Sequence, residues 1–99
     1  MTINEKMNGS NLTLELAGRL DTMTAPELEK ALKEKLNGVT ELVLDFSKLE
    51  YISSAGLRVL LAAHKTMMKQ GGMKVVHSNE TINEIFEVTG FADILTIEQ

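Results

Sequence analysis

Cysteine and tryptophan are absent from this sequence, and proline occurs once. Without cysteine the chain has no disulfide, no thiol nucleophile and no thiolate metal ligand, and a reducing compartment is expected. Three phenylalanines and one tyrosine are too few for a platform on which nucleic-acid bases stack. The only histidines, His64 and His77, lack the spacing of paired metal ligands. We therefore expect His64 to be structural and His77 to be structural or simply exposed, predict no metal site, and favour a binding protein over an enzyme.

Long apolar runs are also missing. The longest, Val59–Ala63, is far shorter than the roughly 20 residues that span a bilayer. The first ten residues carry neither the basic nor the apolar segment of a signal peptide. Fourteen acidic and ten basic residues give a net charge of −4, the wrong sign for a nucleic-acid binder. We therefore expect a cytoplasmic protein with neither a membrane nor a nucleic acid as partner.

The remaining composition is that of one globular domain. The chain has 99 residues, of which 43% are hydrophobic and 24% charged, and it is too short for two independent cores. We predict a single domain over residues 1–99. Neither a GxxxxGK[ST] loop nor a GxGxxG motif is present, so we predict no cofactor.

Strand and helix patterns alternate along the chain. Residues 2–17 are typical of two strands joined by a tight turn, and a loop over 18–23 is expected to follow them. Thr24 to Glu27 fit a capping box that begins a helix, which ends at Asn37-Gly38. Leu42 to Leu44 form a continuous apolar run, which is typical of a strand covered on both faces.

The second half of the chain continues this alternation. We predict a loop over 46–53, a helix from about Ser54 to Gln70 and a strand over 73–77. A third helix, capped by Ser78 or Asn79, ends at Gly90, and a last strand covers 94–97. The fold class is therefore α/β, with a mostly parallel mixed β-sheet of about five strands, an N-terminal β-hairpin and three main helices.

Two serines stand where the second helix begins. Ser53 or Ser54 could be an N-cap, which would accept a hydrogen bond from a free backbone amide. Alternatively, one of them is a phosphoacceptor, because a phosphate at this position would meet free amides and the positive end of the helix dipole. Ala55 and Gly56 keep the surroundings open to another protein. The pattern leaves both interpretations open.

Asp45 is a second candidate site because it follows the apolar run of the third strand. A phosphoryl-accepting aspartate needs acidic neighbours for Mg²⁺ and a nearby lysine, and the first strand ends in Met7-Asn8 instead. We therefore expect Asp45 to bind backbone amides of the following segment.

Charges are distributed unevenly over the second half of the chain. Residues 51–79 contain four basic residues and no acid, whereas residues 80–99 contain five acids and no base. The basic and the acidic stretch could each simply form a surface that is exposed to solvent and has no partner. The distribution is also compatible with a partner surface on the second helix, in which Arg58 lies one turn beyond Ser54.

Four motifs together resemble the STAS domain family, specifically its stand-alone bacterial anti-sigma factor antagonists. They appear in the family's order and spacing and are Gly18–Asp21, Leu42–Ser47, Tyr51–Leu61 and Glu87–Phe91. The resemblance implies that Ser54 is phosphorylated by a partner anti-sigma factor that is also a serine kinase. Many members carry Asp before this serine, whereas this chain has Ser53, so Ser53 is the alternative acceptor.

The resemblance further implies a partner-switching function. The unphosphorylated protein would bind the anti-sigma factor and release the sigma factor, phosphorylation would end this binding, and a PP2C-type phosphatase would restore it. The partner-binding residues expected on this basis are Asp21, Ser53, Ser54, Gly56, Leu57 and Arg58. The alternative is a STAS interaction subunit of a transporter or signalling scaffold.

Overall fold

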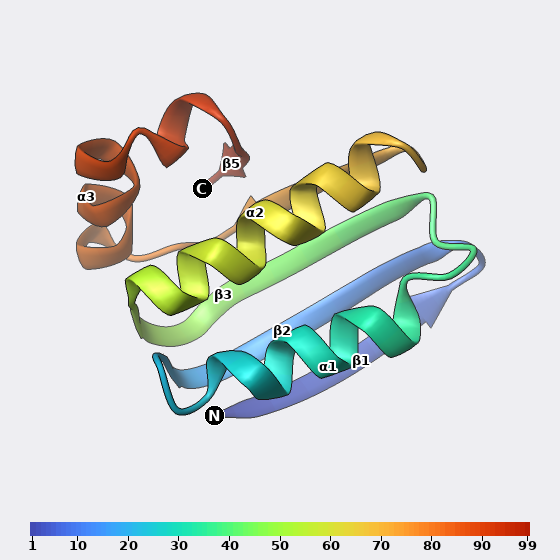
Figure 1. The fold of residues 1–99 in the computed structure, drawn as a ribbon, viewed down its shortest axis with the longest axis horizontal. Coiled ribbons are helices and arrows are strands. Elements are labelled where there is room, and N and C mark those ends of the chain that lie inside the picture. Colours follow the sequence, from blue (N-terminus) through green and yellow to red (C-terminus); the bar gives the residue numbers. More distant parts are fainter.

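Nine elements follow one another in the computed structural model, which describes residues 1–99 (Figure 1). The strands are β1 (Thr2–Asn8), β2 (Asn11–Leu20), β3 (Glu41–Ile52), β4 (Gly72–Val76) and β5 (Thr96–Glu98). The helices are α1 (Ala25–Lys35), α2 (Ser54–Met68) and α3 (Glu80–Thr89), with a short 3₁₀ turn, η1 (Phe91–Asp93), before β5. The α/β class, the five strands and the three main helices are confirmed.

The N-terminal hairpin forms as predicted, but its second strand is longer. β1 pairs antiparallel with β2 from Thr2 opposite Ala17 to Asn8 opposite Asn11. The expected loop over 18–23 is wrong in its first part, because β2 continues to Leu20. Leu20 pairs with Ile52 in the parallel ladder, and its side chain is completely buried. Burial of this leucine therefore extends the strand.

The predicted loop over 46–53 is wrong, because β3 continues through this segment to Ile52. Its buried residues Phe46, Leu49 and Ile52 are three positions apart, not two as in a regular strand. Two register shifts in the pairing with β2 account for this spacing, since each adds one unpaired residue to β3. Because the bulges interrupt the regular alternation of buried and exposed residues, the sequence pattern did not predict this part of β3.

The sheet has the order β1-β2-β3-β4-β5, and every pair after the first is parallel. Because the chain crosses the sheet in one direction through right-handed connections, its helices fall on one face. Figure 1 shows α1 and α2 side by side over the same face. The predicted strand covered on both faces is therefore wrong: Leu42 and Leu44 are buried beneath the helices, whereas Val43 on the opposite face is half-exposed.

Helix α3 and the C-terminal strand complete the fold. The side chain of Asn79 caps α3 by accepting a hydrogen bond from the Ile82 amide at 2.8 Å. Gly90 ends the helix with a positive φ of 81°, as predicted. The last strand begins at Thr96, two residues later than expected, because Ile94 and Leu95 form the turn after η1, in which both amides donate hydrogen bonds to the Phe91 carbonyl oxygen. No helix of this fold has the length and apolar character needed to cross a membrane.

Candidate functional site

The carboxyl ends of β2 and β3 meet at one edge of the sheet, where ligands and partners of parallel sheets commonly bind. Leu20 and Ile52 are paired there, and the Ser53 amide donates a hydrogen bond to the Leu20 carbonyl oxygen at 2.9 Å. The loop that begins at Asp21 therefore lies beside the start of α2. Thr22 from this loop lines the same shallow pocket as Ala55 and Arg58 from the helix.

The two serines at the start of α2 have different surroundings. Ser53 is the N-cap: its backbone is extended, and its Oγ accepts a hydrogen bond from the Gly56 amide at 3.4 Å. Ser54 is the first helical residue, is exposed, and its hydroxyl has no hydrogen-bond partner within the chain. The amides of Ser54 and Ala55 also have no intramolecular acceptor. An exposed hydroxyl thus lies beside free amides at the positive end of a helix.

Gly56 allows the start of α2 to lie directly on the ends of the strands. A Cβ atom at this position would be 2.7 Å from Cγ of Leu20 and 2.9 Å from Cγ1 of Ile52. Real Cβ atoms do not approach other carbon atoms this closely, so any side chain would push α2 away from the sheet. Glycine therefore determines the height of Ser54 above the strand ends.

Leu57 and Arg58 differ in exposure, because consecutive residues of a helix point about 100° apart around its axis. The side chain of Leu57 is only 5% exposed and belongs to the core, so it offers a partner little surface, and the contact role expected for it stays a prediction. Gly56 is buried as well, so it can affect a partner only through the position of the helix. Arg58 is exposed and has no ion-pair partner within the chain. Of these three residues, Arg58 alone presents its side chain to solvent.

Asp21 organises the loop before α1. Its Oδ1 accepts hydrogen bonds from the amides of Met23 at 3.0 Å and Thr24 at 3.1 Å. The predicted capping box is wrong, because the Thr24 hydroxyl donates to the Arg19 carbonyl oxygen at 2.8 Å and makes no cap bond to the helix. The local turn made by the Asp21 carboxylate replaces it.

The pKa of Asp21 is lowered by these contacts. Partial desolvation alone would raise the pKa, but the hydrogen bonds from the Thr24 and Met23 amides outweigh it. The Thr24 hydroxyl and the charge of Arg19, whose Nε lies 3.9 Å from Oδ2, lower the pKa further. The carboxylate therefore stays charged over the neutral pH range.

Arg19 makes a second contact that the sequence did not suggest. Its guanidinium carbon lies 4.5 Å from the centre of the Tyr51 ring, in a cation–π arrangement. Arg19 and Tyr51 are direct neighbours in the β2–β3 ladder. Predicting this neighbour relation requires the register of β3, and the two bulges hide that register.

Replacing Asp21 by asparagine should change how stability depends on pH. A carboxyl group with a lowered pKa stabilises the fold fully above its unfolded pKa, ordinarily 3.8, and this contribution is lost as pH falls through the folded value. The difference in unfolding free energy between the wild type and Asp21→Asn should therefore be constant near neutral pH and shrink below about pH 5. Urea unfolding between pH 3 and 7 measures it. A difference that does not vary with pH would contradict this assignment.

The other polar candidates lie outside this edge or bind the backbone. Oδ1 of Asp45 accepts a hydrogen bond from the Ser47 amide at 2.9 Å, so the interpretation of Asp45 as a backbone-binding residue is confirmed. His64 is half-exposed on α2 and His77 is exposed after β4. No group of three or more histidine, aspartate or glutamate side chains is arranged to hold a metal ion. The edge formed by Asp21 and the start of α2 remains the candidate site.

Comparison with known proteins agrees with the motifs. A family model described as "Mlab, STAS domain" matches residues 3–96. The anti-sigma-B factor antagonist of Bacillus subtilis is 29% identical over 98 residues, which cover 98% of this chain and 90% of that protein. A crystal structure of an anti-sigma factor antagonist from Mycobacterium paratuberculosis is 26% identical with a TM-score of 0.89, and covers 98% of this chain and 84% of its own.

The fold is also shared with SpoIIAA, an anti-sigma factor antagonist of Bacillus whose structure is known in unphosphorylated and phosphorylated forms. The TM-scores are 0.77 and 0.76, at 15% and 16% identity. The alignments cover 99% of this chain and 87% and 92% of the two SpoIIAA chains. With the family model matching nearly its whole length, the chain belongs to the STAS domain family.

Proposed function

We propose that this protein is an anti-sigma factor antagonist, in which residues 1–99 act as one STAS domain of that type. In its unphosphorylated form it binds an anti-sigma factor and thereby releases the sigma factor. The anti-sigma factor is also a serine kinase, and phosphorylation of Ser54 ends the binding. The names of the relatives from Bacillus subtilis and Mycobacterium paratuberculosis support the partner class.

The single observation that carries the phosphorylation step is the exposed hydroxyl of Ser54. It belongs to the first residue of α2 and is free of hydrogen bonds within the chain, whereas the hydroxyl of Ser53 caps the helix. A kinase can reach Ser54 without breaking a cap. The free amides of Ser54 and Ala55 can accommodate a phosphate that carries about −1.5 to −2 charges. The folded domain is thus able to carry the modification.

The protein acts in this scheme by binding and not by catalysis. Its contact surface consists of the exposed part of the site, namely Asp21, Ser54 and Arg58, with Ser53 beside them. A PP2C-type phosphatase removes the phosphate and restores binding. Kinase, phosphatase and antagonist meet in the cytoplasm.

A pull-down from the native host tests this proposal. Tagged wild-type protein and Ser54→Ala serve as baits, and the phosphorylated residues of each bait are mapped by mass spectrometry. We expect both baits to capture an ATP-binding anti-sigma factor, and phosphate to be found on Ser54 of the wild type alone. Capture of a transporter or of a scaffold protein in place of an anti-sigma factor would contradict the proposed function.

A further inference from the structure

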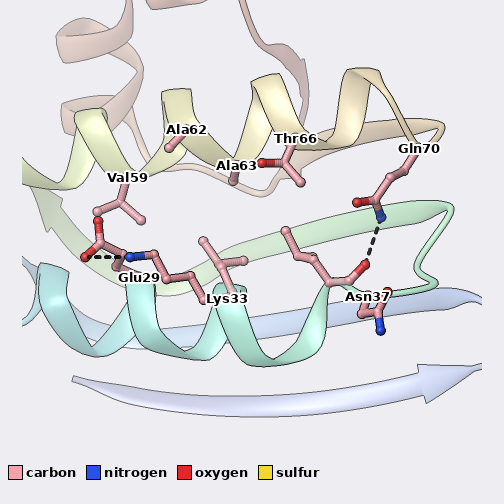
Figure 2. Close-up of a pocket in the computed structure, with 10 residues that line it drawn as sticks. Glu29, Lys33, Asn37, Val59, Ala62, Ala63, Thr66 and Gln70 are labelled. Carbon is pink, nitrogen blue, oxygen red and sulfur yellow. Dashed lines mark hydrogen bonds and ion pairs between the residues drawn. The ribbon is translucent and has the colours of Figure 1, made fainter.

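A groove of about 390 Å³ runs between α1 and α2 (Figure 2). Its apolar lining is formed by side chains from both helices, namely Leu32, Leu36, Val59, Ala62 and Ala63. The two alanines leave space where longer side chains would otherwise close the gap between the helices. Figure 2 shows Glu29 and Lys33 at one end of this groove and Asn37 and Gln70 at the other.

Hydrogen bonds from Gln70 link the two helices at one end of the groove, and an ion pair within α1 lies at the other. Nε2 of Gln70 donates hydrogen bonds to the carbonyl oxygens of Leu36 at 2.8 Å and Val39 at 2.7 Å, which joins the end of α2 to the end of α1. At the other end, Nζ of Lys33 lies 3.9 Å from Oε1 of Glu29. Because this pair is neutral overall, the α1 rim of the groove carries little net charge.

The groove continues to the candidate site. A shallower pocket between the same helices is lined by Ala55 and Arg58, and it shares Glu29 and Val59 with the groove. The lining residues therefore run from Ala55 near the start of α2 to Gln70 just after its end, about 22 Å at a rise of 1.5 Å per residue. This length suits a helix of about four turns. Its first end is adjacent to Ser54.

The crest of α2 beside the groove is basic. Arg58, Lys65 and Lys69 follow the spacing of one helical stripe that also contains Ala62 of the groove. All three basic side chains are exposed, and none makes an ion pair within the chain. Helix α2 contains no acidic residue. A ligand in the groove would therefore meet positive charge along one whole side.

We propose that this groove binds an amphipathic helix with an acidic edge. Apolar side chains of that helix enter the space above Ala62 and Ala63, and its carboxylates face Arg58, Lys65 and Lys69. This inference rests on the proposed function, since the helix belongs to the anti-sigma factor. Phosphate on Ser54 adds negative charge at the end of the groove where the acidic edge begins, so it repels the same helix.

Binding of designed peptides to the full-length protein tests the groove without an anti-sigma factor. A labelled 16-residue helical peptide with leucines at i, i+3, i+4 and i+7 and glutamates along one edge is compared with the same peptide carrying lysines. Fluorescence anisotropy should show tighter binding of the acidic peptide. Lys65→Glu should weaken this binding about tenfold, because an attraction becomes a repulsion. Ala62→Trp should weaken it at least about tenfold by filling the groove.

Two variants serve as matched controls. Lys6→Glu makes the same charge change at an exposed position of β1, and Met68→Trp adds an indole to an exposed position of α2; neither residue lines the groove. Both should bind the acidic peptide as the wild type does, and circular dichroism confirms that all four variants are folded. Equal affinity for acidic and basic peptides, no binding of either, or unchanged binding by Ala62→Trp would overturn the groove assignment. The mapping of phosphate on Ser54 is independent of these outcomes.

Discussion

Phosphorylation of Ser54 should weaken binding of the anti-sigma factor by a factor of about 30 to 4000, and Ser54→Glu should reproduce the lower part of this range. The penalty for burying a charge without a partner at an interface is on the order of 2–5 kcal/mol, which corresponds to these factors. Glutamate carries one negative charge where phosphoserine carries nearly two, so its effect is smaller. Isothermal titration calorimetry with the purified anti-sigma factor measures both affinities.

The physical basis of this effect is local. Ser54 is exposed at the start of α2, and Asp21, whose lowered pKa keeps it negatively charged, begins the loop that follows the adjacent end of β2. A second negative group increases the charge that a partner must desolvate. In the unbound protein no partner removes water from the phosphate, and the free amides at the start of α2 also stabilise it. The modification therefore acts on the complex more than on the fold.

Control variants separate the role of Ser54 from that of its neighbour. Asn8→Glu places the same charge on an exposed residue paired with Asn11, at the opposite end of β2 from the site, and should leave the affinity unchanged. Ser53→Ala should lower the unfolding free energy by about 1 kcal/mol through loss of the cap and leave the phosphorylation switch intact. Ser54→Ala should bind constitutively. If Ser54→Ala is still phosphorylated by the cognate kinase, Ser53 is the acceptor.

The sequence predicted the order of elements well, since hairpin, helix and strand patterns with their turn residues depend on local chemistry. It failed for residues 46–53, because the bulges of β3 arise from pairing with a strand some 30 positions earlier in the chain. The same limit applies to the site. Ser53 and Ser54 look alike as helix-start residues, and only the hydrogen bond to the Gly56 amide shows which one caps the helix.

Leu57 illustrates a second limit of the sequence. Its place in the motif next to Gly56 suggested a contact surface, but helical rotation turns its side chain into the core while Arg58 points outward. The groove between α1 and α2 was not predicted at all. The groove depends on the distance between α1 and α2. These helices lie side by side because the connections from β2 to β3 and from β3 to β4 have the same handedness.

The glycine pair that ends α2 gives the largest predicted effect on stability. In the sequence Gly71 and Gly72 are equivalent helix stops, but a Cβ on Gly71 would lie 1.9 Å from the Thr40 carbonyl oxygen. Its φ of 157° is also one that residues with side chains rarely adopt. The same carbonyl oxygen accepts a hydrogen bond from the Gly72 amide at 3.1 Å, which ties the start of β4 to the start of β3. A side chain at Gly71 would displace the Thr40 carbonyl oxygen and so break its hydrogen bond with the Gly72 amide.

Gly71→Ala should therefore lower the unfolding free energy by about 3–5 kcal/mol, from backbone strain, overpacking and the lost hydrogen bond. For a domain of this size the melting temperature should fall by about 15–25 °C. Gly72→Ala is the matched control: no atom lies within 4 Å of its added Cβ, so its stability should stay within about 0.5 kcal/mol of the wild type. Differential scanning calorimetry compares the two variants. Equal melting temperatures would mean that the turn between α2 and β4 yields to the added methyl group, and that the contact with Thr40 contributes little to the fold.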